Sequence, residues 1–258
     1  MNIFLTGHRG FIGSHMLEAL IRQGHQVTTY EWEDGVRPGV LGQDWVIHMG
    51  AISSTVERNI DKVLRQNYEF SRELFDECKT YGVNLQYSSS ASIYGIKSTF
   101  REDADPDPRT PYAWSKYLFE RYHQQHQGGN QVQGFRYFNV YGPQGESHKG
   151  SQASPHYQFM KQYQETGQVR VFENSENYLR DFIHVSRVID THLKFFDVGE
   201  SGVWNVGTGT ATSFRSVAEL YTKNIVEIPM PDVLKDSYQE YTCADITKLE
   251  QTLSRSTG

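Results

Sequence analysis

Residues 2–13 read NIFLTGHRGFIG and combine a short apolar run, a glycine-rich turn and the first turn of an amphipathic segment. The run over residues 2–6 predicts a strand, and Ile12, Met16 and Leu20 recur at the spacing of one helix face. The glycines permit a tight turn and let the backbone approach a pyrophosphate, whose charge the first helical N–H groups can meet. This order of elements predicts a dinucleotide-binding unit.

Four more short apolar-rich runs follow, with helical patterns between the later ones. Alternation of this kind predicts a parallel sheet with crossover helices. The runs are residues 27–30, 45–49, 85–88 and 132–136, and the helical patterns are residues 67–81 and 112–126.

The connection at residues 32–44 is too short for the usual doubly wound plan. Its length of about a dozen residues is near the lower limit for any parallel crossover. We therefore expect a Rossmann-type doubly wound α/β sheet that lacks its third strand and has the second strand at its edge. Residues 1–142 are expected to form the dinucleotide-binding domain, with 181–207 returning to it, and 143–258 to form mainly a small α+β substrate-binding domain.

Composition restricts the class of protein. The net charge of −6 is spread without a long basic run, so a nucleic-acid surface has no electrostatic support. No stretch approaches the roughly 18 apolar residues of a spanning helix, and the N-terminus does not read as a cleavable signal, so we expect a cytoplasmic protein. Cys78 and Cys243 match no metal spacing, and we expect reduced thiols and no metal.

The charges after the second predicted strand bear on the choice between NAD and NADP. Glu31 could accept hydrogen bonds from the adenosine ribose, which favours NAD, whereas Arg9 and Arg37 could clamp a 2′-phosphate, which favours NADP. Tyr30 stands just before Glu31, where the acidic residue of NAD enzymes often lies. We expect NADP, with NAD as the alternative.

Tyr112 and Lys116 form a YxxxK pattern on one face of a predicted helix. A phenol with a pKa of about 10 is a poor base at neutral pH, and a neighbouring lysine together with a positive nicotinamide ring would favour the phenolate. Hydride transfer from a carbinol needs such a base beside the reacting hydroxyl. Upstream, residues 87–95 read YSSSASIYG, and Ser90 could hydrogen-bond the reacting oxygen and share its proton with Tyr112.

The glycine turn, the serine-rich strand end and YxxxK, in this order, resemble the extended short-chain dehydrogenase/reductase family. Within that family the chain is most similar to the ADP-L-glycero-D-manno-heptose 6-epimerases. The likeness extends to HMGAISST at 48–55, GFRYFNVYGP at 134–143, HKGS at 148–151, FENSEN at 172–177, RDF at 180–182 and NVGTG at 205–209.

The resemblance implies a nucleotide-sugar epimerase that removes hydride from C6 of the heptose and returns it to the other face of the resulting aldehyde. Two acid/base groups are then needed, and by position they are Tyr112 and Lys149. Lys116 would hold the cofactor ribose, and Ser90 would orient the carbonyl. A lysine suits this role only if its pKa is lowered toward the working range.

The other expected site residues form two groups. From the glycine turn and the resemblance together, the cofactor would be lined by Gly7, Arg9, Gly10, Phe11, Ile12, Gly13, Tyr30, Glu31, Arg37, Ala51, Ser53, Asn67, Lys116 and Val140. The resemblance places the nucleotide sugar against Asn139, Ser151, Phe172, Glu173, Asn174, Ser175, Arg180 and Tyr238. Arg180 is the expected diphosphate partner because its planar fork matches phosphate oxygens.

Some features depart from the family pattern and leave alternatives open. Gln158 stands where the family places a substrate-binding histidine, and His156 is close enough to substitute. A 4-epimerase or reductase acting on another nucleotide sugar, or a non-catalytic NAD(P)-binding protein, is an alternative. A dehydratase is disfavoured because Ser90 is not followed by an Asp-Glu pair. Relatives commonly build subunit interfaces from the segments corresponding to 67–81 and the tyrosine-bearing helix, so we expect a homo-oligomer.

Overall fold

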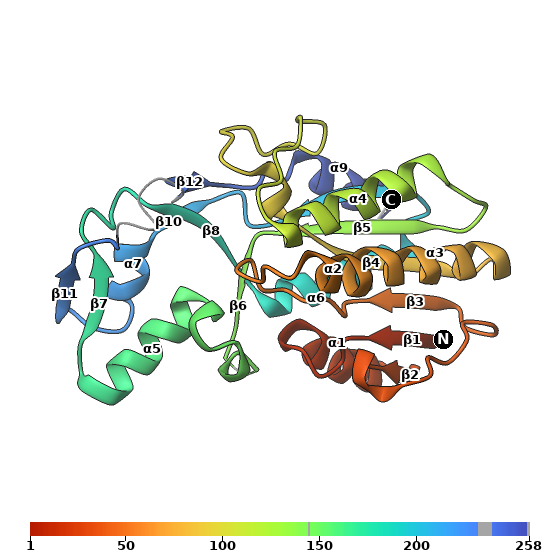
Figure 1. Cartoon of the computed structure of the whole chain (residues 1–258), viewed down its shortest axis with the longest axis horizontal. Helices are drawn as coiled ribbons and strands as arrows, with labels where there is room; N and C mark the ends of the chain where they lie inside the picture. Colours follow the sequence, from red (N-terminus) through yellow and green to blue (C-terminus); the bar gives the residue numbers. More distant parts are fainter. Residues whose placement is uncertain (144, 232–238, 257–258) are drawn as a thin grey trace.

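A six-stranded parallel sheet forms the larger half of the chain in the computed structural model, which describes residues 1–143, 145–231 and 239–256 (Figure 1). We call this sheet with its helices the large-sheet half. In spatial order the strands are β2 (Gln26–Tyr30), β1 (Asn2–Thr6), β3 (Trp45–His48), β4 (Asn84–Ser90), β5 (Val132–Tyr137) and β9 (Gly202–Val206).

The edge position of β2 confirms the shortened sheet. A doubly wound sheet of the usual plan would place another strand beside β2, whereas here β2 pairs with β1 alone. The chain instead passes through a short 3-10 helix, η1 (Trp32–Asp34), and returns directly to β3.

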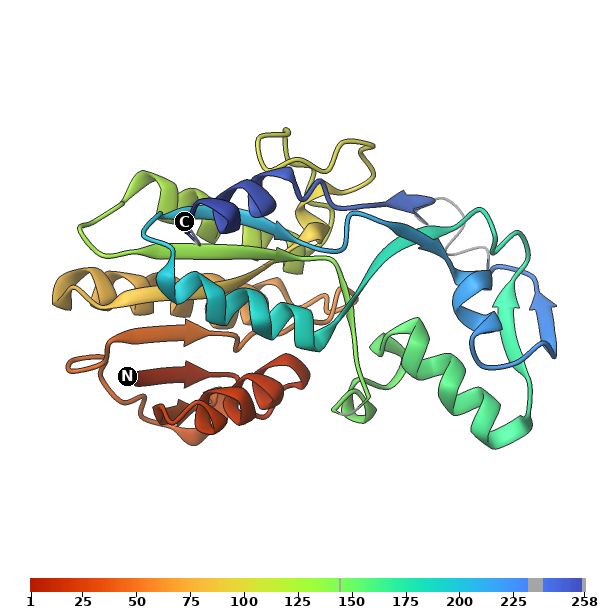
Figure 2. The ribbon, with the colours of Figure 1, turned by 180° about the vertical axis from the view of Figure 1, so that it is seen from behind.

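Helices cover both faces of the large sheet (Figures 1 and 2). On one face, α3 and α4 pack on Phe4, Val46 and Leu85, and on the other, α1 and α6 pack on Ile3 and Leu5. The C-terminal helix α9 also packs on this half, beside β9, which we did not predict. The helices are α1 (Phe11–Arg22), α2 (Ile60–Val63), the π-helix η2 (Leu64–Glu69), α3 (Phe70–Tyr81), α4 (Pro111–Gln125), α6 (Val185–Lys194) and α9 (Thr247–Ser256), with the 3-10 turns η3 (Ala91–Tyr94) and η5 (Phe195–Asp197).

Short strands and two helices build a smaller unit at the carboxyl edge of the large sheet (Figure 2). We call it the small-sheet half. The strand β8 (Leu179–His184) pairs with β6, β10 and β12, and β7 pairs with β11. The other elements are β6 (Asn139–Tyr141), η4 (Ser147–Gln152), α5 (Pro155–Thr166), β7 (Val169–Phe172), β10 (Ala211–Ser213), α7 (Phe214–Glu219), β11 (Ile225–Ile228) and β12 (Tyr241–Thr242).

Among the residues that the structure describes, no helix has the length and apolar character needed to cross a membrane.

Candidate active site

Backbone contacts hold the glycine turn so tightly that two of its positions have no room for a side chain. Gly7 has a φ of +78°, and a Cβ there would lie 2.4 Å from the Gly50 nitrogen. A Cβ at Gly13 would lie 1.9 Å from the Gly7 carbonyl oxygen. Gly10 caps α1 in an extended conformation, so the first N–H groups of the helix can serve an anion. The turn therefore fits the pyrophosphate of a dinucleotide.

A pocket opens beside this turn, at the carboxyl ends of β1 and β2. Glu31 lies at its rim, where Oε1 accepts a hydrogen bond from the Arg9 backbone N–H at 2.5 Å and lies 3.3 Å from His8 Nδ1. Four of the expected cofactor residues, Gly7, Tyr30, Glu31 and Ala51, line the pocket together with Thr6, Trp32, Glu33, Gly50, Ile52, Gln66 and Phe70. This pocket has the ring surfaces and carboxylates that an adenosine group would meet.

Both arginines that we expected to clamp a 2′-phosphate are paired with carboxylates instead. Arg37 forms an ion pair with Glu77 on α3 and also donates to the Pro38 carbonyl at 2.9 Å. Arg9 Nη2 donates to Asp34 Oδ1 at 2.8 Å. Each guanidinium therefore has an acidic partner in this structure, and the 2′-phosphate clamp stays a prediction.

Asn67, which follows Gln66 of this pocket, makes several hydrogen bonds within the protein. Its Oδ1 accepts from Ile52 N at 2.8 Å, and its Nδ2 donates to Ile52 O at 3.0 Å and to Ser115 Oγ at 3.1 Å. A buried chain continues from the backbone of Asn67 through Ser71 and His48 to Thr6 at the end of β1. Asn67 therefore fixes the loop after β3 against the tyrosine-bearing helix α4.

Tyr112 enters the site from the first turn of α4, which begins at Pro111 with Thr110 as its N-cap. Burial raises the pKa of the Tyr112 phenol, and a hydrogen bond with Ser90 partly offsets the rise. Burial thus favours the neutral phenol, opposite to the effect that we expected from Lys116. The predicted Ser90–Tyr112 pair is present.

Lys116 lies one helical turn after Tyr112 and is buried. Its Nζ donates to the Ser88 carbonyl at 2.8 Å and lies 5.9 Å from the centre of the Tyr112 ring. Burial lowers the pKa of Lys116 to about 8, against a rise caused by Glu120. The ammonium group is thus held at the carboxyl end of β4, beside Ser90.

Lys149 approaches the glycine turn from the small-sheet half, on η4. Its Nζ lies 4.4 Å from the centre of the Phe11 ring, at the first residue of α1, and 3.9 Å from Glu146 Oε2. Burial lowers the pKa of Lys149, and Glu146 acts in the opposite direction. The direction of the shift is the one that an acid/base lysine requires.

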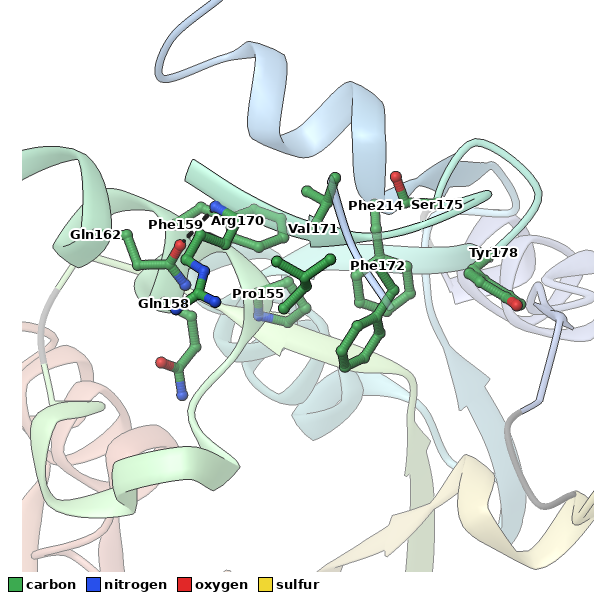
Figure 3. Close-up of a pocket in the computed structure, with 11 residues that line it drawn as sticks. Pro155, Gln158, Phe159, Gln162, Arg170, Val171, Phe172, Ser175, Tyr178 and Phe214 are labelled. Atoms are coloured by element: carbon green, nitrogen blue, oxygen red, sulfur yellow. Dashed lines mark hydrogen bonds between the residues drawn. The ribbon is translucent and has the colours of Figure 1, made fainter. Parts of the chain in front are cut away.

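A cavity of about 410 Å³ lies between α5 and β7 in the small-sheet half (Figure 3). Two of the expected substrate residues, Phe172 and Ser175, line it, and Ser175 Oγ is buried with no hydrogen-bond partner among the described residues. Glu173 and Asn174 are exposed at the turn after β7, where Asn174 has a φ of 60°. The other lining residues are Pro155, Gln158, Phe159, Gln162, Arg170, Val171, Tyr178, Phe214 and Ile228.

Gln158, rather than His156, faces this cavity. The Gln158 amide donates to the Gly150 carbonyl at 2.8 Å. His156 stacks on Tyr141 with ring centres 3.8 Å apart and hydrogen-bonds the Tyr221 hydroxyl. His156 does not line this cavity, and its substitution for the family histidine stays a prediction.

The remaining expected residues lie in several environments. Arg180 Nη1 donates to the Leu179 carbonyl at 2.8 Å and Nη2 to the Gln239 carbonyl, and Asn139 Nδ2 donates to Asp181 O at 3.4 Å. Ile12 and Val140 pack against both apolar clusters that involve α6, the one around Ile3 and Leu5 and the one around Phe135 and Trp204. Ser53 is exposed in the loop after β3. Tyr238 lies outside the described residues, as does the side chain of Ser151.

A family model described as the NAD dependent epimerase/dehydratase family matches residues 3–34 and 39–207. The chain belongs to this family. The gap between the two matched segments falls in the shortened connection after β2, where the family plan and this chain differ.

Solved structures of nucleotide-sugar enzymes share the fold. ADP-L-glycero-D-manno-heptose-6-epimerase from Helicobacter pylori is 24% identical, with a TM-score of 0.85 over 98% of this chain and 90% of that one. UDP-N-acetylglucosamine 4-epimerase from Methanobrevibacter ruminantium is 23% identical, with a TM-score of 0.87 over 98% and 91%. UDP-glucose 4-epimerase from Thermotoga maritima is 27% identical, with a TM-score of 0.82 over 98% and 93%.

Several residues of the two pockets in this family member were not expected from the sequence. Trp32, Gln66 and Phe70 line the pocket beside the glycine turn, and Tyr178 and Phe214 line the cavity in the small-sheet half. The Phe70 ring stacks with Tyr30 and meets Trp32 edge-on. Aromatic residues in loops and first helical turns could have drawn attention, but no spacing rule joins these positions.

Proposed function

We propose that this chain is a nucleotide-sugar epimerase that inverts one carbon by transient oxidation and re-reduction, with ADP-glyceromanno-heptose inverted at C6 as its substrate. The observation that carries the proposal is a pair of acid/base groups on separate elements, one at the carboxyl end of β4 and one beside the glycine turn. Tyr112 with Ser90 comes from α4 and β4, and Lys149 comes from η4 against Phe11. Epimerisation, unlike a one-way oxidation, needs both groups.

A bound nicotinamide dinucleotide would supply the exchange of hydride with the sugar carbon. Tyr112 would take the proton of the reacting hydroxyl and return it, while Ser90 hydrogen-bonds the same oxygen. Lys149 would perform the matching transfer on the other face of the carbonyl, for which its lowered pKa is suited. The ammonium group of Lys116 would offer a hydrogen bond to the cofactor ribose.

The pocket beside the glycine turn supports NAD over the expected NADP. Glu31 and Glu33 line this pocket, and a carboxylate accepts ribose hydroxyl hydrogens but repels a 2′-phosphate. Arg9 and Arg37 are each neutralised by a carboxylate. We therefore expect untreated protein to retain NAD.

The cavity in the small-sheet half supports a nucleotide sugar as the substrate. Its aromatic and apolar walls suit a base, and the buried Ser175 hydroxyl calls for a hydrogen-bonding ligand atom. Mass spectrometry of untreated protein would identify both the retained dinucleotide and any co-purified sugar. A retained UDP-sugar in place of an ADP-sugar would favour a 4-epimerase.

Turnover of the two C6 epimers of ADP-heptose tests the proposal directly. Tyr112→Phe and Lys149→Ala should each lower epimerisation by about 10²-fold or more, because each removes the proton carrier of one face. Half-reactions with an aldehyde analogue should remain measurable in both. Tyr117→Phe on the same helix and Lys161→Ala on the surface of α5 are the matched controls. Equal turnover in the wild type and both site variants would refute the two-group scheme.

A further inference from the structure

A buried chain of polar side chains runs beneath the site, between the large sheet and α6. Tyr137 OH lies 2.5 Å from His192 Nε2, and His192 Nδ1 lies 2.8 Å from Gln86 Oε1. Gln86 Nε2 in turn donates to Gln133 Oε1 at 3.0 Å. His192, Gln86 and Gln133 have no solvent exposure, so water does not compete for these hydrogen bonds.

Backbone carbonyl groups fix the direction of every hydrogen bond in this chain. Gln133 Nε2 donates to the carbonyls of Phe195 and Val198 at 3.0 and 2.9 Å, so Gln133 Oε1 must be the acceptor toward Gln86. Gln86 Nε2 also donates to the His192 carbonyl at 3.0 Å, which leaves Gln86 Oε1 as the acceptor toward the imidazole.

The imidazole of His192 therefore carries its hydrogen on Nδ1. Burial lowers the pKa of His192 to about 3, so the ring is neutral and has a single N–H near neutral pH. With Nδ1–H directed to Gln86, Nε2 is an acceptor, and the hydroxyl hydrogen of Tyr137 must point to it. The Tyr137 oxygen can then act only as an acceptor toward any further hydrogen-bond partner.

Tyr137 occupies the end of β5 nearest the proposed reacting groups. It is the direct register partner of Ser90 on β4, and burial and the nearby Tyr112 raise the pKa of its phenol. Ser90 and Tyr137 thus lie side by side at the carboxyl ends of β4 and β5, Tyr112 lies near both, and the chain through His192 commits the hydrogen of the Tyr137 hydroxyl.

We propose that His192 is a positioning residue, which holds Tyr137 as an obligatory hydrogen-bond acceptor for a hydroxyl or amide hydrogen of the ligand bound beside Ser90 and Tyr112. His192 lies between the large sheet and α6 and acts through Tyr137. The kinetic consequence rests on the proposed epimerase function, whereas the direction of the hydrogen bonds does not.

The tautomer of His192 is tested in the intact wild-type chain by two-bond ¹H–¹⁵N correlation spectra of ¹⁵N-histidine-labelled protein, with His192→Asn for assignment. The expected result is an Nδ1–H ring without a protonated Nε2. An Nε2–H ring at His192 would overturn the proposal, because Tyr137 would then donate its hydrogen elsewhere.

Kinetics of matched variants test the role of Tyr137. Asparagine at 192 can still donate toward Gln86 but does not reach Tyr137, whereas glutamine reaches Tyr137. His192→Asn should lower kcat about tenfold at a nearly unchanged KM, and His192→Gln should recover most of the loss. The Tyr137→Phe/His192→Asn double variant should match Tyr137→Phe alone, and a multiplied loss of kcat would refute action through Tyr137.

A second buried tyrosine–histidine pair provides the control. Tyr87 OH and His123 Nδ1 are 3.2 Å apart in the core between the sheet and α4. His123→Asn should lower the melting temperature as His192→Asn does but leave kcat unchanged. If kcat fell equally in both variants, the effect of His192→Asn would be general destabilisation, and the positioning role would be refuted. If the wild type turns over no nucleotide sugar, the proposed function fails, and the spectra alone decide how Tyr137 is held.

Discussion

The two halves of the molecule handle buried charge differently. In the large-sheet half, Glu120 on α4 forms an ion pair with Arg136 on β5, and both side chains are almost fully buried. In the small-sheet half, the donors to the buried Asp181 carboxylate among the described residues are neutral: the N–H groups of Thr208, Gly209 and Ala244 and the Thr208 hydroxyl. The difference shows that the Glu120 carboxylate depends on a charged side chain, whereas the Asp181 carboxylate is held mainly by backbone N–H groups from distant parts of the chain.

Acidic pH should have the largest effect on stability, and it should act on the large-sheet half. Burial lowers the pKa of His48 and His192 to about 3 and that of His123 to about 4, and all three lie in the large-sheet half. Between pH 6.5 and 4 the unfolded chain binds protons at these rings that the folded chain does not bind. Stability that is complete above about pH 6.5 is therefore lost as the pH falls, on the order of 5 kcal/mol by pH 4.

Tryptophan fluorescence during acid titration measures this loss, because all four tryptophans, Trp32, Trp45, Trp114 and Trp204, lie in the large-sheet half. His123→Gln should flatten the titration. His126→Gln, at the exposed end of α4, should leave the fluorescence transition in place. A transition confined to the range below pH 4, where carboxylates titrate, would contradict the prediction.

Removing one member of the buried ion pair should have the next largest effect. Glu120→Gln leaves the Arg136 guanidinium buried without its counter-charge and should lower the free energy of unfolding by about 3 kcal/mol. The partner experiment is Glu227→Gln, which breaks the exposed Arg215–Glu227 pair and should change stability by less than about 0.5 kcal/mol. Urea unfolding measures the free energy of unfolding of both variants. Similar losses in the two variants would show that the buried pair is no more important to stability than the exposed one.

The tight glycine turn should give the smallest of the three stability effects. Gly13→Ala places a Cβ 1.9 Å from the Gly7 carbonyl, and the forced shift should cost about 2 kcal/mol and abolish dinucleotide binding. A methyl group added at Gly129 would have no neighbour within 4 Å, so Gly129→Ala should be nearly neutral. Thermal unfolding with and without added NAD separates the two effects. Retained NAD binding in Gly13→Ala would show that the turn can relax.

Local patterns were sufficient for five of the six strands of the large sheet and for the shortened connection. The strand β1 was predicted to the residue, and residues 26–30, 45–48, 84–90 and 132–137 were found within a few residues of their predicted bounds. The edge position of β2 followed from chain length alone, because a dozen residues cannot hold a further helix and strand. The π-helix at Leu64–Glu69 was not predictable, since it depends on Asn67 meeting a distant loop and helix.

Contacts between distant parts of the chain determine features of the candidate site that the sequence did not reveal. The ion pair between Arg37 and Glu77 joins residues forty positions apart, and it engages a guanidinium that the NADP expectation had assigned to a 2′-phosphate. The sign of the pKa shift of Tyr112 likewise follows from its burial, which no spacing in YxxxK reveals. The Ser90–Tyr112 contact was predictable because a strand end and a first helical turn meet at one sheet edge.

The brief link between β2 and β3 has a practical consequence for protein engineering. Val36 in this link is 96% exposed, at the very position where larger members of the fold carry additional secondary structure. A reporter module spliced in at Val36 would leave the strand ladder uninterrupted and would sit close to the adenosine end of the cleft. Val36 is therefore a suitable insertion point for a reporter of dinucleotide binding at the proposed cofactor site.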